Sequence, residues 1–140
     1  MSNQPQVGYL LKQAQSLLRL RMEEALKPLG LTVSQYSCLH LLRREPGMSA
    51  AALARGTFMT RQSMNSMLQL LLDRGLVGRP DRAESGRALP TELTPSGRDS
   101  LDAAEIRVDD IERRMLSRLT RSENDALARV LSECVIALSR

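Results

Sequence analysis

The sequence is poor in aromatic residues, histidine and cysteine, and these shortages exclude several classes of function. Its 140 residues include two tyrosines, one phenylalanine and no tryptophan, whereas proteins that bind single strands or RNA stack bases on aromatic faces. A structural zinc site needs four ligands at paired spacings, which His40, Cys38 and Cys134 cannot supply. We therefore expect no bound metal and no platform for unpaired bases.

Signatures of catalysis and of membrane insertion are also missing. No glycine-rich phosphate loop, nucleophile elbow or His-Glu-x-x-His pattern occurs, so neither a cofactor nor an enzymatic activity is expected. The longest run of leucines is Leu70–Leu72, and no apolar run approaches the about 20 residues of a membrane span. No export signal is recognisable. We expect a cytoplasmic protein without a disulfide framework, in which Cys38 and Cys134 both pack into the core.

The charge of the chain is positive and is carried almost entirely by arginine. The 20 basic residues outnumber the 16 acidic ones, which gives a net charge of +4, and only Lys12 and Lys27 are lysines. Residues 43–87 hold eight arginines against four acidic residues, so the excess is concentrated there. Because the planar guanidinium group suits phosphate and guanine edges, this distribution favours binding to nucleic acid.

The spacing of apolar and capping residues predicts six helices and one hairpin. Apolar residues at intervals of three and four indicate helices, and a serine or threonine before such a run indicates a helix start. Gly56 is expected to close the third helix. The predicted fold is mainly α with a short β-hairpin wing: helices over 7–27, 33–44, 50–55, 61–74, 95–119 and 121–138, and strands over 76–79 and 87–93.

Residues 49–93 have the order of a winged helix-turn-helix unit, which is a short helix, a tight turn, a longer helix and a hairpin. The second helix of such a unit enters the major groove of DNA and presents side chains to base edges. Here that helix combines an apolar stripe with an opposite face of arginine, amide and hydroxyl groups, and the hairpin arginines can reach the minor groove. The candidate DNA-binding residues are Ser49, Thr60, Arg61, Gln62, Ser63, Asn65, Ser66, Arg79, Arg82 and Arg87.

Four motifs in register resemble the MarR family of bacterial transcription regulators. The resemblance covers residues 7–138 and implies an intertwined homodimer, with residues 1–30 and 95–140 as dimerisation helices and residues 31–94 as the DNA-binding region. It also implies a transcription regulator, with a repressor favoured over an activator. Such a regulator binds pseudo-palindromic double-stranded DNA and is released by a small aromatic or phenolic ligand. The motifs are LTVSQY at 31–36, MTRQSMN at 59–65, DRGLVGR at 73–79 and LTPSG at 93–97.

Three points stay open at the level of the sequence. By position Arg87 matches the wing arginine of the family, but Ser85 replaces the aspartate usual two residues earlier. Tyr36 and His40 share a helix face and either line a ligand pocket or pack as hydrogen-bonded core residues. The alternative function is a winged-helix module that binds protein instead of DNA, which the positive charge of residues 43–87 disfavours.

Overall fold

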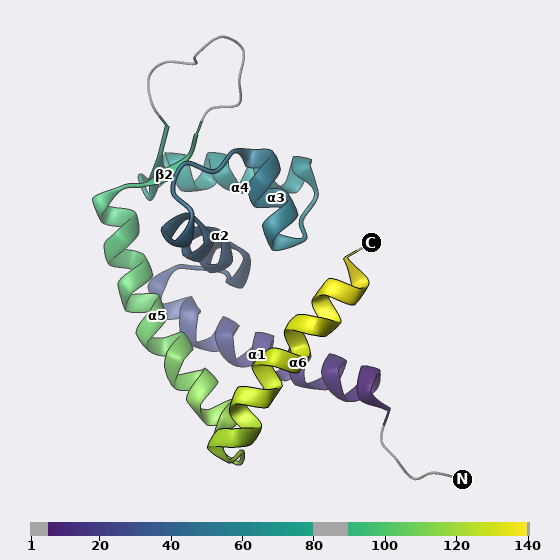
Figure 1. Cartoon of the computed structure of the whole chain (residues 1–140). Coiled ribbons are helices and arrows are strands. Elements are labelled where there is room, and N and C mark those ends of the chain that lie inside the picture. Colours follow the sequence, from purple (N-terminus) through teal and green to yellow (C-terminus); the bar gives the residue numbers. More distant parts are fainter. Residues whose placement is uncertain (1–5, 80–89, 140) are drawn as a thin grey trace.

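The computed structural model describes residues 6–79 and 90–139, and there the chain forms a mainly helical fold with a small hairpin (Figure 1). The six predicted helices and the hairpin are confirmed in their order. No described helix is long and apolar enough to cross a membrane. The elements are α1 (Val7–Leu26), the 3-10 helix η1 (Lys27–Leu29), α2 (Val33–Arg44), α3 (Ala50–Thr57), α4 (Arg61–Asp73), β1 (Val77–Gly78), β2 (Glu92–Leu93), α5 (Pro95–Leu116) and α6 (Arg121–Leu138).

Side-chain caps determine where five of the helices begin. Thr32 and Thr120 form the two predicted capping boxes, in which the hydroxyl accepts the N–H of the residue three positions on and that residue's side chain accepts the threonine N–H. Ser49, Thr60 and Thr94 cap α3, α4 and α5 through their hydroxyls. Since a cap of this kind stabilises a helix by about 1 kcal/mol, the starts of α2 to α6 are encoded locally.

The turn of the helix-turn-helix unit differs from the prediction. Gly56 does not close α3, because the helix continues to Thr57 and Phe58 takes the C-cap position with φ 57°. Gly56 instead lies inside the helix, where a Cβ would lie 2.6 Å from Cδ2 of Leu41 in α2 and would require that side chain to move. Left-handed backbone favours glycine, so Phe58, whose side chain is 88% exposed, combines backbone strain with exposed apolar surface.

The base of the hairpin is connected to the loop between α2 and α3. β1 and β2 pair antiparallel over two residues each, so among the described residues the strands are shorter than predicted, and residues 87–89 of the second predicted strand lie outside the described residues. Thr91 pairs instead with Met48: its N–H donates to the Met48 carbonyl at 3.0 Å, and the N–H of Gly47 donates to the Thr91 carbonyl at 3.1 Å. The segment Thr91–Leu93 therefore pairs with β1 through β2 and with the loop before α3 through Thr91.

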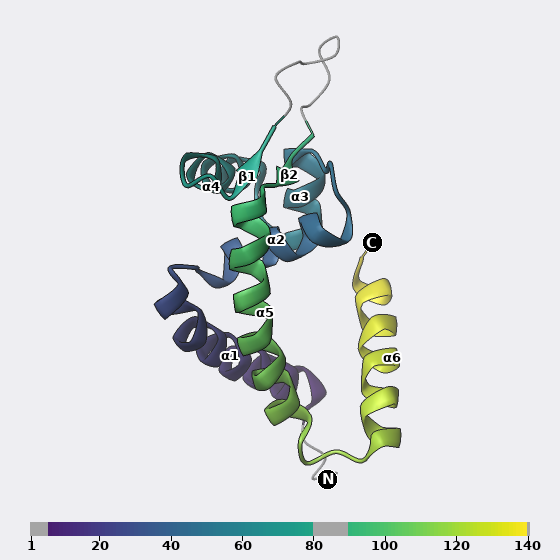
Figure 2. The same ribbon diagram turned by 90° about the vertical axis from the view of Figure 1, so that its left-hand side faces the viewer.

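One hydrophobic core holds α2, α3, α4 and the hairpin against the adjoining ends of α1 and α5. Figures 1 and 2 show these elements gathered at one end of the molecule. The predicted apolar stripe of α4 is confirmed, since its four members are buried. The buried apolar residues are Leu26, Leu31, Tyr36, Cys38, Leu39, Leu42, Leu53, Ala54, Met64, Met67, Leu68, Leu71, Leu76, Val77, Leu101 and Ala104.

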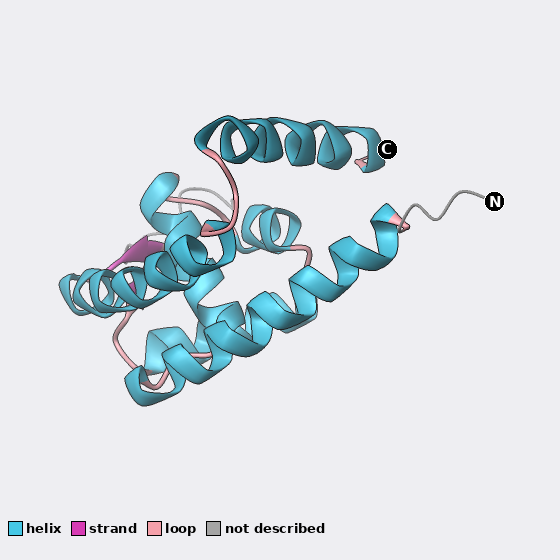
Figure 3. Ribbon diagram, turned by 90° about the horizontal axis from the view of Figure 1, so that it is seen from below, coloured by secondary structure: helices cyan, strands magenta, loops and turns pink. Residues whose placement is uncertain are grey.

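The remaining parts of α1 and α5, together with α6, extend away from this core. α5 packs along α1, and Figure 2 shows α6 turning back beyond the end of α5. α6 contributes no buried residue, and Figure 3 shows it apart from α1. These helices expose large apolar side chains, as is typical of surfaces that bind another protein chain; they include Leu10, Leu11, Leu17, Leu20, Ile106, Met115, Val130, Leu131, Val135, Ile136 and Leu138.

Candidate nucleic-acid interface

Helix α4 divides its side chains between the core and solvent. The apolar stripe faces inward, and the five predicted contact residues on the other side are exposed. Within residues 6–79 and 90–139, the side chains of these five make no hydrogen bond or ion pair. Their donors and acceptors are therefore available to a ligand outside the chain. The five residues are Arg61, Gln62, Ser63, Asn65 and Ser66.

Two further candidates, Ser49 and Thr60, lie at the N-termini of α3 and α4. Ser49 Oγ accepts the N–H of Ala52 at 3.1 Å, and Thr60 Oγ1 accepts the N–H of Ser63 at 3.1 Å. Each hydroxyl keeps its own hydrogen as a donor. The positive end of a helix dipole adds to the attraction for an anion. Both positions therefore suit contact with a phosphate oxygen.

An additional arginine lies beside the start of α4. Arg55 of α3 and Arg61 of α4 line a cavity of about 260 Å³ with Ala51, Ala54 and Met59. The sequence pattern does not single out Arg55, because its proximity to Arg61 depends on the turn between the two helices. Two guanidinium groups beside one helix start raise the local density of positive charge at the interface.

One of the three predicted wing arginines lies in the described part of the chain. Arg79 follows β1, and its Nε donates to Oγ1 of the fully buried Thr91 at 3.4 Å. This contact holds the side chain against the base of the hairpin. Arg82 and Arg87 lie outside the described residues, as does Ser85, so their roles stay predictions from the sequence.

Another arginine of the basic segment has a structural role. Nη1 of Arg74 donates to the carbonyl of Gly30 at 2.8 Å and lies 3.5 Å from Oε1 of Gln35. The end of α4 is thereby tied to the connection between α1 and α2. Arg74 is exposed, but its guanidinium group is engaged in hydrogen bonds within the chain, so we assign it no contact with DNA.

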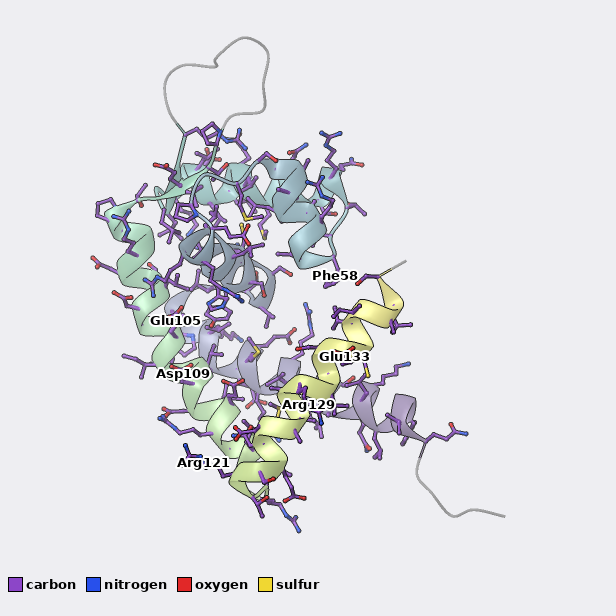
Figure 4. The ribbon with its side chains drawn as sticks, in the orientation of Figure 1. Phe58, Glu105, Asp109, Arg121, Arg129 and Glu133 are labelled. Atoms are coloured by element: carbon purple, nitrogen blue, oxygen red, sulfur yellow. The ribbon has the colours of Figure 1, made fainter. Side chains whose placement is uncertain are left out.

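Tyr36 packs into the core, and His40 is hydrogen-bonded beside it. Tyr36 is 7% exposed, and its ring stacks on His40 with centroids 5.8 Å apart. Nδ1 of His40 lies 3.2 Å from Oε1 of Glu105, on the part of α5 that passes α2 (Figure 4). Burial, reinforced by the negative charges of Glu105, Asp109 and Glu112, raises the pKa of Tyr36 to about 12. Tyr36 is therefore buried and His40 is hydrogen-bonded, and a role of the pair in a ligand pocket stays a prediction from the sequence.

The two cysteines have different environments. Cys38 is buried as predicted, and burial raises the pKa of its thiol to about 12. Cys134 is exposed, so the prediction that both cysteines pack into the core is wrong for Cys134. The physical reason is that α6 contributes no residue to the core of this chain.

We expect a maleimide reagent to leave Cys38 unmodified in the folded protein, even at about pH 9, because the core excludes the reagent and the thiol stays protonated. In the variant Cys134→Ser, mass spectrometry should find no label under native conditions and one label per chain in urea. If Cys38 of the folded variant reacted as fast as it does in urea, this expectation would be contradicted.

The arrangement of α3, α4 and the adjoining hairpin, with a polar face on the second helix, defines a winged helix-turn-helix protein. A profile of the MarR family matches residues 29–88. The HTH-type transcriptional repressor Rv2887 of Mycobacterium tuberculosis is 42% identical over 127 residues, which is 91% of each chain. The chain belongs to the MarR family.

Solved structures of the mycobacterial repressor have a similar fold. Its complex with DNA matches with a TM-score of 0.78 at 38% identity, covering 94% of this chain and 98% of the other. Its complex with salicylic acid matches with a TM-score of 0.76 at 40% identity, covering 96% and 99% of the two chains. The similarity thus extends over the winged unit and the terminal helices together.

Proposed function

We propose that this chain is a transcriptional repressor that binds a specific double-stranded DNA sequence as a homodimer. The observation that carries the proposal is the exposed polar face of α4, which lies opposite a buried apolar stripe. The DNA complex of the mycobacterial relative supports it. The protein acts by binding rather than by catalysis, and it acts in the cytoplasm, where bacterial DNA is found.

Base recognition falls to the long polar side chains of α4. Gln62 and Asn65 can each pair with the N6 and N7 edge of adenine, and Arg61 can pair with O6 and N7 of guanine in the major groove. All three are exposed near the start of the helix. This is the part of a recognition helix that reaches base edges.

The remaining candidates contact the DNA backbone and the minor groove. Hydroxyl groups and arginines at helix starts bind phosphates and orient the protein without reading sequence. The wing arginines insert into the minor groove next to the bound major groove, where a narrow groove attracts positive charge. The backbone contacts are assigned to Ser49, Arg55, Thr60, Ser63 and Ser66, and the wing contacts to Arg79, Arg82 and Arg87.

Residues 1–30 and 95–140 form the dimerisation region, and residues 31–94 form the DNA-binding lobe. The apolar side chains exposed on α1, α5 and α6 support this division, because a second copy of the chain would remove them from water. α1 and α5 also border a cavity of about 320 Å³ that such a copy can fill. Its lining consists of Ala14, Leu17, Leu18, Arg21, Ile111, Arg114 and Met115.

A small aromatic acid or phenol releases the repressor from DNA. The complexes of the mycobacterial relative with salicylic acid and with p-aminosalicylic acid support this class of effector. Such a ligand acts by preferring a dimer whose two recognition helices are wrongly spaced for the operator.

The test of the proposed function is selection of bound duplexes from a randomised DNA library, followed by sequencing. We expect a pseudo-palindrome whose half-sites lie about 34–36 Å apart, which is one turn of DNA. Recovery of no preferred sequence by a folded dimer would reject the proposal and favour a module that binds protein. Salicylate added to the complex with the selected duplex then tests the effector class.

Replacing Gln62 with alanine should weaken binding to the selected duplex by about 1–3 kcal/mol and leave binding to random duplexes nearly unchanged. The reason is that an amide pairing with a base edge contributes to one sequence only. Fluorescence anisotropy with both duplexes at one salt concentration measures the difference. An equal loss on the selected and random duplexes would show that Gln62 contacts the backbone and does not read a base.

A further inference from the structure

The DNA-binding lobe is joined to the dimerisation region where α2 crosses α5. α2 packs against α3 and β2 within the lobe and also against α5. α5 begins at the hairpin and runs the length of the molecule to the start of α6 (Figures 1 and 2). Any rotation of the lobe relative to the terminal helices must therefore shift the contact between α2 and α5.

Arg43, in the last turn of α2, bonds three acceptors along α5. Its Nη1 lies 2.8 Å from Oε2 of Glu105, and its Nη2 lies 2.6 Å from Oδ1 of Asp102 and 3.2 Å from the carbonyl oxygen of Arg98. These acceptors extend over two turns of α5. One planar guanidinium group thus fixes α2 along the direction of the α5 axis.

The network continues one turn back along α2. The second carboxylate oxygen of Glu105 lies 3.2 Å from Nδ1 of His40, whose ring stacks on the buried Tyr36. Glu105 therefore contacts two successive turns of α2, and Arg43 contacts two successive turns of α5. Contacts at two levels on each helix oppose both sliding and rotation of one helix against the other.

The exposure of the network indicates what it contributes. The side chains of Arg43 and Glu105 are 32% and 27% exposed, and that of Asp102 is 64% exposed, so solvent screens much of the attraction and the effect on global stability is small. The apolar core, to which α2 and α5 contribute Leu39, Leu42 and Leu101 among other residues, is non-directional and permits small shear movements of packed helices. Directional charged hydrogen bonds select one position among those that the apolar contacts allow.

We infer that Arg43 is a positioning residue for operator recognition, which fixes the angle of the DNA-binding lobe on α5 and so the spacing between the two α4 helices of the dimer. This inference rests on the proposed function. Lysine cannot replace arginine here, because an ammonium group lacks the planar fork that reaches Asp102 and Glu105 together.

The experiment compares Arg43→Gln and Arg43→Lys with the wild type and with Arg19→Gln, a control whose ion pair with Glu23 lies within α1. Binding is measured by anisotropy on the selected palindrome, on the same palindrome with one base pair added or removed between half-sites, and on a single half-site. We expect both Arg43 variants to lose about tenfold affinity for the native spacing while half-site binding changes less than about twofold. The ratio of affinities between the native and the altered spacings should therefore be smaller for the Arg43 variants than for the wild type.

Equal losses on every duplex, or no loss on the native palindrome, would overturn the inference, because a positioning residue acts only where two lobes bind together. Glu105→Gln removes the partner of Arg43 on α5 and should have the same effect. This second variant separates the loss of the network from a folding defect that is specific to the Arg43 variants. Failure of the wild type to bind any palindrome would instead reject the proposed function itself.

Discussion

Replacing Gly97 with alanine should destabilise the fold by about 2–3 kcal/mol and lower the melting temperature by about 5–10 °C. Gly97 lies in the first turn of α5, where its N–H donates to Oγ1 of Thr94 at 3.0 Å. A Cβ at this position would lie 1.9 Å from the carbonyl oxygen of Leu76 and 2.9 Å from its carbonyl carbon. Both atoms belong to the backbone, so no change of rotamer can relieve the overlap.

The overlap would also disturb the base of the hairpin. The Leu76 carbonyl accepts the N–H of Thr94 at 3.1 Å, and the Thr94 hydroxyl donates to the carbonyl of Gly75 at 2.5 Å. To admit a methyl group, α5 must move away from the chain that leads into β1, and these bonds must lengthen. The higher helix propensity of alanine, about 1 kcal/mol, offsets only part of this cost.

Gly8→Ala is the matched control, since Gly8 lies in the first turn of α1 and nothing is within 4 Å of the position of its Cβ. We expect its melting temperature to equal or slightly exceed that of the wild type. Thermal unfolding of all three proteins at one protein concentration makes the comparison. A Gly97→Ala protein as stable as the wild type would show that the contact with Leu76 yields without cost.

The local features of this fold can be predicted from the sequence, because they depend on neighbouring residues. The capping threonines Thr32, Thr60, Thr94 and Thr120 each lie next to a regular apolar pattern and begin the predicted helices. The exposed face of α4 follows from the same periodicity. Gly97 lies in one of the motifs that carry the family resemblance, but the reason for a glycine is visible only where α5 meets Leu76.

Features that depend on residues far apart in the chain could not be predicted. Arg43 and Glu105 are separated by 62 positions, and no pattern in either segment indicates the pairing. Cys134 lies on an apolar stripe that resembles those of the core helices, yet none of the residues of α6 is buried in the described part of this chain. Periodicity indicates that a helix face will be buried, but it does not indicate whether the same chain or a second copy buries it.

The second large effect concerns salt. Raising the monovalent salt concentration from about 0.05 M to about 0.2 M should weaken binding to the selected duplex by about 10³- to 10⁴-fold. For a dimer that neutralises about 6–8 phosphates, the logarithm of the binding constant falls against the logarithm of the salt concentration with a slope near −5 to −7. Five cations per chain are assigned to the interface, namely Arg55, Arg61, Arg79, Arg82 and Arg87, which is enough to neutralise three or four phosphates per chain besides the contact of Arg61 with a base.

The salt dependence of binding also shows which basic residues contact the DNA. Arg87→Ala should weaken binding to all duplexes and reduce the magnitude of the slope by about 2 per dimer, since each chain loses one cation that lies between phosphates in the minor groove and displaces counterions there. Lys12→Ala, a change on α1 away from the α4 end of the molecule, should leave the slope unchanged. A response to salt that is nearly flat would exclude DNA binding through the arginines of the winged unit. An equal reduction in both variants would mean that net charge, rather than the wing, determines the affinity.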